Sequence, residues 1–289
     1  MKLTPQQFLD WETKCITLLA MSGAGKTTLA NKLPKHKWFH YSGDYRIGTK
    51  YLEEPILDNI KRQAMEVPFL RDLLLSDSIY ICNNVSVDNL APVSSFLGKM
   101  GNPALGGLPL KEFKRRQALH HQAEVAAMLD VPEFIRKAED IYNYKYFLND
   151  AGGSICELDD LHVLETLAKH TLIIYIKIPS TLEQTIIERA KTDPKPLYYR
   201  EAFLDEKLAE FMALKQCTDA DLIVPDEFVT WVFPELFRAR IPRYQAIADQ
   251  YGYTVDADAV AKVQSEADFM QLIADALAQQ QASGSSSCR

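Results

Sequence analysis

A glycine-rich run near the start of the chain carries the residue types that bind phosphate. Residues 16–28 read ITLLAMSGAGKTT, so an apolar stretch leads into small residues and then into Gly25-Lys26-Thr27. The backbone N–H groups of such a turn can point at an anion, and a helix that begins there adds its positive N-terminus. The lysine would reach the β- and γ-phosphates, and the threonine hydroxyl would hold Mg²⁺. The run therefore predicts a site for a nucleoside triphosphate, with ATP and Mg²⁺ as the expected cofactors.

The surroundings of this run fit a phosphate-binding loop. The full pattern begins with glycine, and Ala20 stands at that position here, which alanine can occupy where φ is negative. A strand pattern precedes the loop, a helical pattern follows at 28–33, and Pro34 ends it. The alternative is a glycine-rich turn that only connects strand and helix. We expect the nucleotide contacts to come from Ser22, Gly23, Ala24, Gly25, Lys26, Thr27 and Thr28.

Composition limits the class of protein. The chain has 289 residues, of which 47% are hydrophobic and 25% charged, as in globular proteins. A net charge of −7 disfavours a broad nucleic-acid-binding face. No apolar run approaches the roughly 20 residues that span a membrane. The five cysteines are widely spread without a CxxC pair, which indicates a reducing cytoplasm and argues against zinc.

Short strand-like runs alternate with helical patterns along the chain. The clearest strand is TLIIYIKI at 171–178, which is short, apolar and β-branched, as in the interior of a parallel sheet. Further strands are expected at 38–41, 146–149 and 253–255, whereas 78–85 fits a strand or a buried helix. Helices are expected at 3–13, 53–75, 110–129, 132–143, 158–169, 181–190 and 262–280, and loop at 86–110. This order predicts an α/β fold with helices on both faces of a parallel sheet and a site at the carboxyl ends of its strands.

Five separate segments follow one another in the order and spacing of a known kinase branch. They are AMSGAGKTTLANKL, Asp44 after the second strand, NDAGGSICEL at 149–158, TLIIYIKIPSTLEQTIIERAKTDPKPLYY, and RIPRYQAIADQYGYTVDA at 240–257. Together they resemble the shikimate kinase branch of the P-loop kinases, which includes gluconate-kinase-like enzymes. The resemblance implies a P-loop NTPase three-layer sandwich with a parallel sheet, helical insertions and a lid. It also implies phosphoryl transfer.

The resemblance assigns roles around the phosphoryl acceptor. An acidic residue after the second strand of these kinases holds Mg²⁺ or orients the acceptor hydroxyl, which implies either role for Asp44. The glycine-rich segment implies that the backbone of Gly152 and Gly153 approaches the acceptor. Asp150 competes with Asp44, because it also stands at a strand end, where a carboxylate beside Mg²⁺ can take a hydroxyl proton. The alternative for both aspartates is a turn residue that binds its own backbone.

The resemblance also implies cationic residues that reach the nucleotide or the acceptor. Arg189 matches an arginine at the end of a strand–helix unit, and Lys195 replaces the arginine of an Arg-Pro-Leu lid. Lid cations must arrive only with substrate, since water would otherwise be phosphorylated. The alternative is a solvated helix end, where cations favour the dipole. Arg240 matches an Arg-x-Pro-x-Tyr helix and is expected to bind cofactor or substrate. Arg136 loosely matches an acceptor-binding arginine.

Departures from the pattern limit what the resemblance implies. Two glycines and Ser154 stand in place of three glycines, and insertions occur at about 65–130 and 201–238. Shikimate kinases are markedly shorter. We therefore expect one kinase-like domain over 1–282 with a disordered tail at 283–289, and we take the fold and phosphoryl transfer from the resemblance, but not the acceptor.

Two further patterns have competing interpretations. The basic run Lys111–Arg116, with His120 and His121, could bind an acidic substrate, but a solvated helix face is favoured. Tyr142, Tyr144 and Tyr146 have a period of two, which favours strand packing over base stacking.

Three functions are compatible with the sequence. The first is an ATP- and Mg²⁺-dependent kinase that phosphorylates a hydroxyl of a small molecule. The second is a kinase of nucleotides or nucleotide sugars, similar to zeta toxins. The third is an ATP-binding regulatory protein with weak ATPase activity. A motor or transport ATPase is disfavoured, because 174–178 ends in Pro179 and not in an acidic residue.

Overall fold

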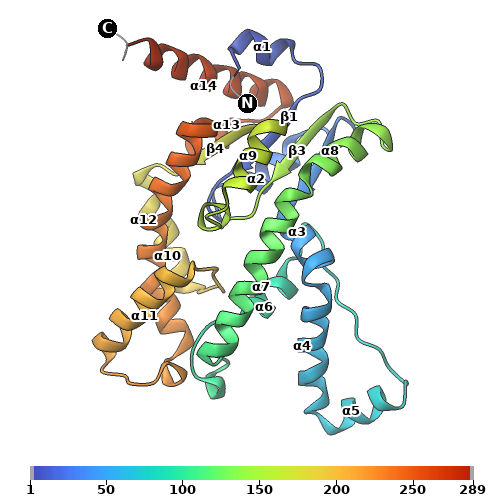
Figure 1. Ribbon diagram of the computed structural model, residues 1–289, viewed down its shortest axis with the longest axis vertical. Helices are drawn as coiled ribbons and strands as arrows, with labels where there is room; N and C mark the ends of the chain where they lie inside the picture. The colour runs from blue at the N-terminus through green and yellow to red at the C-terminus, as the bar shows by residue number, and fades with distance from the viewer. Residues whose placement is uncertain (1–2, 287–289) are drawn as a thin grey trace. The chain divides into compact units, whose positions relative to one another are not determined.

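The computed structural model describes residues 3–286 and contains a five-stranded parallel sheet (Figure 1). The strands are β1 (Cys15–Leu19), β2 (Trp38–Ser42), β3 (Tyr146–Asp150), β4 (Leu172–Lys177) and β5 (Gly252–Asp256). They lie in the order β2-β3-β1-β4-β5, and every neighbouring pair is parallel. The predicted α/β class is therefore confirmed, and the strand expected at 171–178 is β4, which has a neighbour on each side.

The interior strands are buried on both faces. Ile16 and Leu18 of β1 and Ile173 of β4 have no exposed surface, as expected for strands covered by helices. The buried Thr17 hydroxyl bonds to the Thr171 hydroxyl at 2.8 Å and accepts from Nδ2 of Asn149 at 3.1 Å. Polar groups so deep need partners, and these bonds join β1 to its two neighbours.

Helices cover the sheet on two faces. Helix α2 (Lys26–Lys32) contacts β3, α13 (Ala257–Lys262) contacts β4 and β5, and α14 (Glu266–Ser286) contacts β5 and α1 (Pro5–Asp10). Helix α8 (Val131–Asp140) contacts β2 and β3, and α9 (Leu161–His170) contacts β4 and α8. The connections from β1 to β2 and from β2 to β3 run in opposite directions across the sheet. Because such crossovers are right-handed, α2 lies on the opposite face from α8 and α9, which makes three layers.

The chain divides into two compact units. The first comprises Met1–Gly43, Met128–Asp193 and Phe233–Arg289 and contains the whole sheet. It also contains a 3₁₀ turn (Ile155–Glu157) and α10 (Ser180–Thr192). The second comprises Asp44–Ala127 and Pro194–Val232 and is helical. The two predicted insertions supply most of its helices.

The second unit contains short and long helices in chain order. They are α3 (Gly43–Arg46), a π-helical turn (Ile47–Tyr51), α4 (Glu53–Met65), α5 (Pro68–Leu75), α6 (Ala91–Leu97), a 3₁₀ turn (Pro103–Leu105), most of α7 (Leu110–Leu129), α11 (Glu201–Lys215), a 3₁₀ turn (Ala220–Leu222) and the start of α12 (Pro225–Tyr251). Arg116 of α7 joins several of them, donating to the Phe96 carbonyl of α6 at 2.6 Å and to Asn59 of α4 at 2.7 Å. The rings of Phe211, Phe228 and Trp231 join α11 to α12.

Several predicted elements differ from the structure around prolines. The single helix expected at 53–75 is two helices, α4 and α5, because Pro68 lacks an N–H donor and restricts the residue before it. The loop expected at 86–110 contains α6, in which Pro92 lies in the first turn, where its missing N–H has no cost.

Two sequence patterns did not form the elements expected of them. Residues 78–85, which fitted a strand or a buried helix, form no regular element, and Tyr80 is 87% exposed. Of the three tyrosines with a period of two, only Tyr146 belongs to a strand. Tyr142 and Tyr144 precede β3 and pack on the Phe39 ring, with ring centroids 6.0 and 5.5 Å away.

The chain's last helix extends into the predicted tail. The backbone of α14 is helical through residue 286, and residues 287–289 lie outside the described part of the chain. Over the described residues, none of the helices has both the length and the apolar character needed to cross a membrane.

Candidate nucleotide site

The phosphate-binding loop connects β1 to α2 in the first unit. Gly23 and Gly25 have φ angles of 86° and 92°, a left-handed conformation that favours glycine, and Gly25 is the N-cap of α2. A Cβ placed on either glycine would meet no atom within 4 Å, so the space beside both is open. The loop thus has the backbone conformation and the open surface that an anion at a helix N-terminus needs.

Lys26 is bound to the start of its own loop. Its side chain is buried, and Nζ donates a hydrogen bond to the Ala20 carbonyl at 2.9 Å. Ala20 has no exposed surface. The ammonium group is therefore held at the start of the loop by a backbone carbonyl.

The Thr27 hydroxyl donates to Oδ2 of Asp150 at 2.9 Å. Asp150 ends β3, is only 7% exposed, and lies opposite Leu18 of β1 in the sheet. His40 of β2 places Nε2 3.7 Å from the same carboxylate oxygen. A hydroxyl and a carboxylate side by side are hard oxygen ligands of the kind that Mg²⁺ uses with phosphates and waters. Within residues 3–286 no group of three or more His, Cys, Asp or Glu could hold a metal, and such a magnesium site does not need one.

The strand used in the sequence argument against motor ATPases was the wrong one. Residues 174–178, on which that prediction rested, belong to the β4 region, whereas the acidic residue beside the loop ends β3. The residue after Asp150 is Ala151, where a motor enzyme would need a glutamate to activate water. That a motor ATPase is disfavoured stays a prediction, and it now rests on Ala151.

The glycine-rich turn after β3 packs directly on the phosphate-binding loop. A Cβ added to Gly153 would lie 3.2 Å from the backbone nitrogen of Ser22, so only glycine allows this approach without a shift. The Gly153 carbonyl accepts from the Tyr244 hydroxyl at 2.9 Å and from Nη1 of Arg240 at 3.2 Å. The same hydroxyl lies 3.3 Å from the Ala20 carbonyl.

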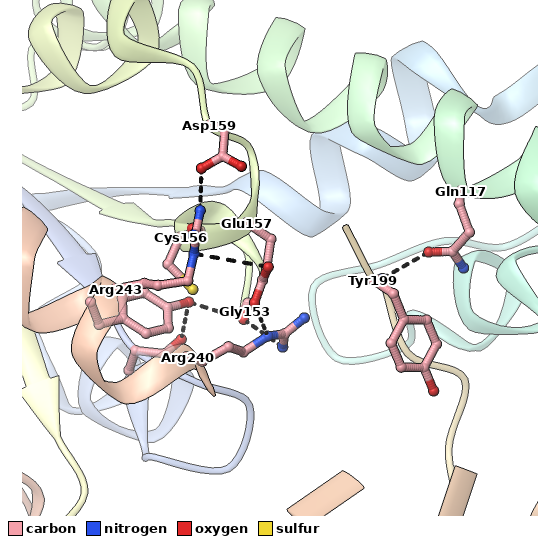
Figure 2. A network of polar contacts seen from close by, with 10 residues as sticks. Gln117, Gly153, Cys156, Glu157, Asp159, Tyr199, Arg240 and Arg243 are labelled. Carbon is pink, nitrogen blue, oxygen red and sulfur yellow. Dashed lines mark hydrogen bonds and ion pairs between the residues drawn. The ribbon is translucent and has the colours of Figure 1, made fainter. Parts of the chain in front are cut away.

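Arg240 and Arg243 of α12 form a polar network with the segment after the glycines (Figure 2). Nε of Arg240 donates to Oε1 of the buried Glu157 at 3.2 Å. Nε of Arg243 donates to the Cys156 carbonyl at 2.8 Å, and its guanidinium also pairs with Asp159. Burial acts to lower the pKa of Arg240, but its interactions with Cys156, Tyr244 and Glu157 outweigh burial and raise that pKa, so Arg240 is a permanent cation. Burial raises the pKa of the Cys156 thiol to about 12, which makes it inert.

The remaining predicted site residues lie in several places. Arg189 is in the last turn of α10 and Arg136 is on α8, both with exposed side chains in the first unit. Asp44 is the second residue of α3, which follows β2, and Lys195 lies in an irregular, exposed stretch after α10, both in the second unit. Gly152 is buried in the turn after β3. The roles of these residues stay predictions.

The basic cluster of α7 is neutralised by neighbouring carboxylates of the second unit. Lys114 pairs with Glu201 and with Asp205, at 3.2 and 2.6 Å. Arg115 and Arg116 both pair with Glu112 at 2.7 Å. These contacts give the cluster a structural role, but Arg116 and His120 are buried, so the interpretation as a solvated helix face was wrong for these two residues.

Sequence reasoning did not place Tyr244, Glu157 or His40 in the site. Tyr244 was a matched position of the Arg-x-Pro-x-Tyr pattern, and Glu157 lies within NDAGGSICEL, so both segments carried a signal. His40 carried none, because its approach to Asp150 depends on the pairing of β2 with β3.

Comparisons with known proteins add little to this site. No protein-family model matches the chain, and neither does any curated protein. A solved structure of shikimate kinase from Bacteroides thetaiotaomicron matches with 13% identity, covering 93% of this chain and 97% of that one, at a TM-score of 0.37. At that TM-score the likeness carries no argument. The parallel sheet, the loop between β1 and α2, and Asp150 at the end of the adjacent strand themselves give the first unit the architecture of a P-loop NTPase.

Proposed function

We propose that the protein is an ATP- and Mg²⁺-dependent kinase that transfers the γ-phosphoryl group to a hydroxyl of a small molecule. The observation that carries this proposal is the hydrogen bond from Thr27 to Asp150, beside Lys26 and two left-handed glycines. A loop that only connected a strand to a helix would need neither the buried lysine nor the paired carboxylate.

The chain's own residues supply binding and positioning in this proposal. The loop backbone over 22–28 binds the phosphates, and Lys26 leaves the Ala20 carbonyl to neutralise the β- and γ-phosphate oxygens. Thr27 and Asp150 would hold Mg²⁺, which neutralises charge on the same oxygens when it is bound. Since phosphoryl transfer needs little covalent chemistry from the protein, these contacts account for most of the catalysis.

The transfer step requires an acceptor whose proton can be removed. The acceptor oxygen bonds to the γ-phosphorus as the bond to the β–γ bridging oxygen breaks, which gives ADP and a phosphate ester. The proton goes to a carboxylate, for which Asp44 stays the proposed residue. Arg189 and Lys195 stay the proposed lid cations, and Gly152, Gly153 and Arg136 the proposed acceptor contacts.

ATP turnover with Mg²⁺ tests this function, with hydroxy acids, sugars, nucleosides and nucleotides as candidate acceptors. We expect one class to raise ADP formation strongly in the wild type, with the increase lost in Lys26→Ala and kept in Lys35→Ala, which removes an exposed lysine after the same helix. Stimulation by a nucleotide or nucleotide sugar would identify the alternative kinase class. Nucleotide binding without stimulation by any class would contradict transfer and favour a regulatory ATP-binding protein.

A further inference from the structure

Two carbonyl groups beside the phosphate-binding loop share three donors. The Ala20 carbonyl accepts from Nζ of Lys26 at 2.9 Å and lies 3.3 Å from the Tyr244 hydroxyl. The Gly153 carbonyl accepts from Tyr244 at 2.9 Å and from Nη1 of Arg240 at 3.2 Å. A tyrosine hydroxyl has one proton, and the shorter distance places it on Gly153. The Ala20 carbonyl is therefore a second acceptor to which the same proton can turn.

Nucleotide binding disturbs this arrangement at one point. When Lys26 turns to the phosphates, the Ala20 carbonyl loses its closest donor, and Ala20 has no exposed surface through which water could replace it. Leaving a buried acceptor without a partner costs the full free energy of removing that group from water. Without a replacement donor, this loss would oppose nucleotide binding.

We propose that Tyr244 and Arg240 form a hydrogen-bond relay that frees Lys26 for the nucleotide. As Lys26 leaves, the Tyr244 proton turns from the Gly153 carbonyl to the Ala20 carbonyl, and Arg240 keeps Gly153 paired. Both carbonyls then have a donor in the free and in the nucleotide-bound protein. Tyr244 and Arg240 are positioning residues in this relay, since they act through the lysine. The inference rests on the proposed nucleotide site.

The surroundings of the two side chains fit a relay of fixed geometry. Tyr244 has no exposed surface, and its ring stacks on Tyr175 at 5.2 Å with the planes 8° apart. Arg240 is fixed by Glu157, and Gly153 is fixed by its close packing on Ser22. The hydroxyl therefore reaches either carbonyl by a rotation of its proton alone. The same neighbours explain why Arg240, predicted to bind cofactor or substrate, points its guanidinium at Glu157 and Gly153.

The chain provides a matched pair of variants for the test. Tyr244→Phe removes the relay hydroxyl and keeps the ring. Tyr175→Phe removes the hydroxyl of the stacked partner, which has no hydrogen-bond partner among the described residues. Binding of the non-hydrolysable analogues of Mg·ATP and Mg·GTP is measured by calorimetry for the wild type and both variants, together with the Tm of each free protein.

We expect Tyr244→Phe to weaken analogue binding by roughly ten- to a hundredfold, because the bound form now contains an unpaired carbonyl. The Tm of the free variant stays near that of Tyr175→Phe, since Lys26 still pairs Ala20 there, and Tyr175→Phe binds like the wild type. A purely structural role of Tyr244 would lower Tm without this selective loss of affinity. In a Lys26→Met background, measured at millimolar analogue, Tyr244→Phe should have no further effect.

The outcomes separate the relay from the nucleotide site. Wild-type affinity in Tyr244→Phe, or an equal loss in Tyr175→Phe, overturns the relay and leaves the proposed function intact. A further loss of affinity in the Lys26→Met background also overturns it, since Tyr244 would then act without the lysine. If the wild type binds neither analogue, the proposed function is wrong and the relay has no purpose.

Discussion

Charged and polar side chains have different kinds of partner in the two units. In the second unit, Lys114 of α7 pairs with Glu201 and Asp205 of α11 and so joins two helices, while Arg115 pairs with a carboxylate one turn away in its own helix. In the first unit, Lys26 donates to a backbone carbonyl, and Asp150 accepts from the Thr27 hydroxyl. Groups held by such exchangeable contacts can turn to a ligand, whereas groups paired with opposite charges already have their counter-ion.

The contrast also concerns burial. Glu157 and Arg240 of the first unit form an ion pair at 2% and 7% exposure, whereas Glu112 and Arg115 of the second unit lie nearer solvent. A buried pair contributes little net stability over an apolar pair, yet the loss of one partner is severe. Replacing one partner of this buried pair in the first unit is therefore expected to reduce stability strongly, and the pair lies beside the phosphate-binding loop.

The largest expected effect is on stability, from the variant Glu157→Ala. It leaves the Arg240 guanidinium buried without its counter-ion, so the free energy of unfolding falls by about 3–5 kcal/mol. Urea unfolding measures this, with Arg115→Ala of the second unit as the contrasting change at less than about 1 kcal/mol. Equal effects of the two variants would remove the contrast between the units.

The next effect is on catalysis, from Lys26→Ala. Loss of the cation that neutralises the γ-phosphate should lower kcat/KM by roughly 10²–10³-fold, with little change in Tm. Steady-state ADP formation measures it. Lys114→Ala of the second unit should leave kcat/KM unchanged, and a comparable loss there would place chemistry among the paired cations.

A smaller effect is expected on metal use, from Asp150→Asn. The amide keeps the size of the side chain but removes the charge that holds Mg²⁺, so the Mg²⁺ concentration for half-maximal nucleotide binding should rise roughly ten- to a hundredfold. Asp44→Asn is the matched comparison, because Asp44 was predicted for the same role. A larger rise in Asp44→Asn would assign the metal to that residue.

The smallest expected effect depends on pH and concerns Glu112. Hydrogen bonds from Arg115, together with Arg116 and against the effect of burial, lower the pKa of Glu112 from 4.5 to about 2. A lowered carboxyl pKa stabilises the fold above pH 4.5, and this contribution is lost as pH falls from 4.5 towards 2. Glu112→Gln should therefore lower the free energy of unfolding by about 1–2 kcal/mol at pH 7, and the difference should shrink towards pH 2. A difference independent of pH would mean that packing, and not charge, holds this pair.

Local sequence predicted the loop and the fold class, because both depend on neighbouring residues. Positive φ at Gly23 and Gly25 and the apolar run at 171–178 are properties of short segments. The partner of Thr27 could not be predicted in this way, since Asp150 lies 123 residues away and reaches it only because β3 pairs with β1. The sequence therefore favoured Asp44, with Asp150 as its competitor for the same roles.

The sequence also could not predict which polar groups are buried or which partners they have. Arg240 matched a family position, but only the fold shows that Glu157 and the Gly153 carbonyl take its donors. The Tyr244 hydroxyl meets Ala20 across a separation of 224 residues. The local pattern of residues 78–85 fitted a strand or a buried helix, yet they form no regular element and Tyr80 is exposed.

Equilibrium binding of Mg·ATP tests the central claim most directly, because it needs no knowledge of the acceptor. The account predicts saturable binding to the wild type that weakens strongly both when EDTA removes Mg²⁺ and in Lys26→Ala, while Lys35→Ala binds normally. Binding of equal strength in Lys26→Ala, or no binding by the wild type, would contradict a nucleotide site at this loop.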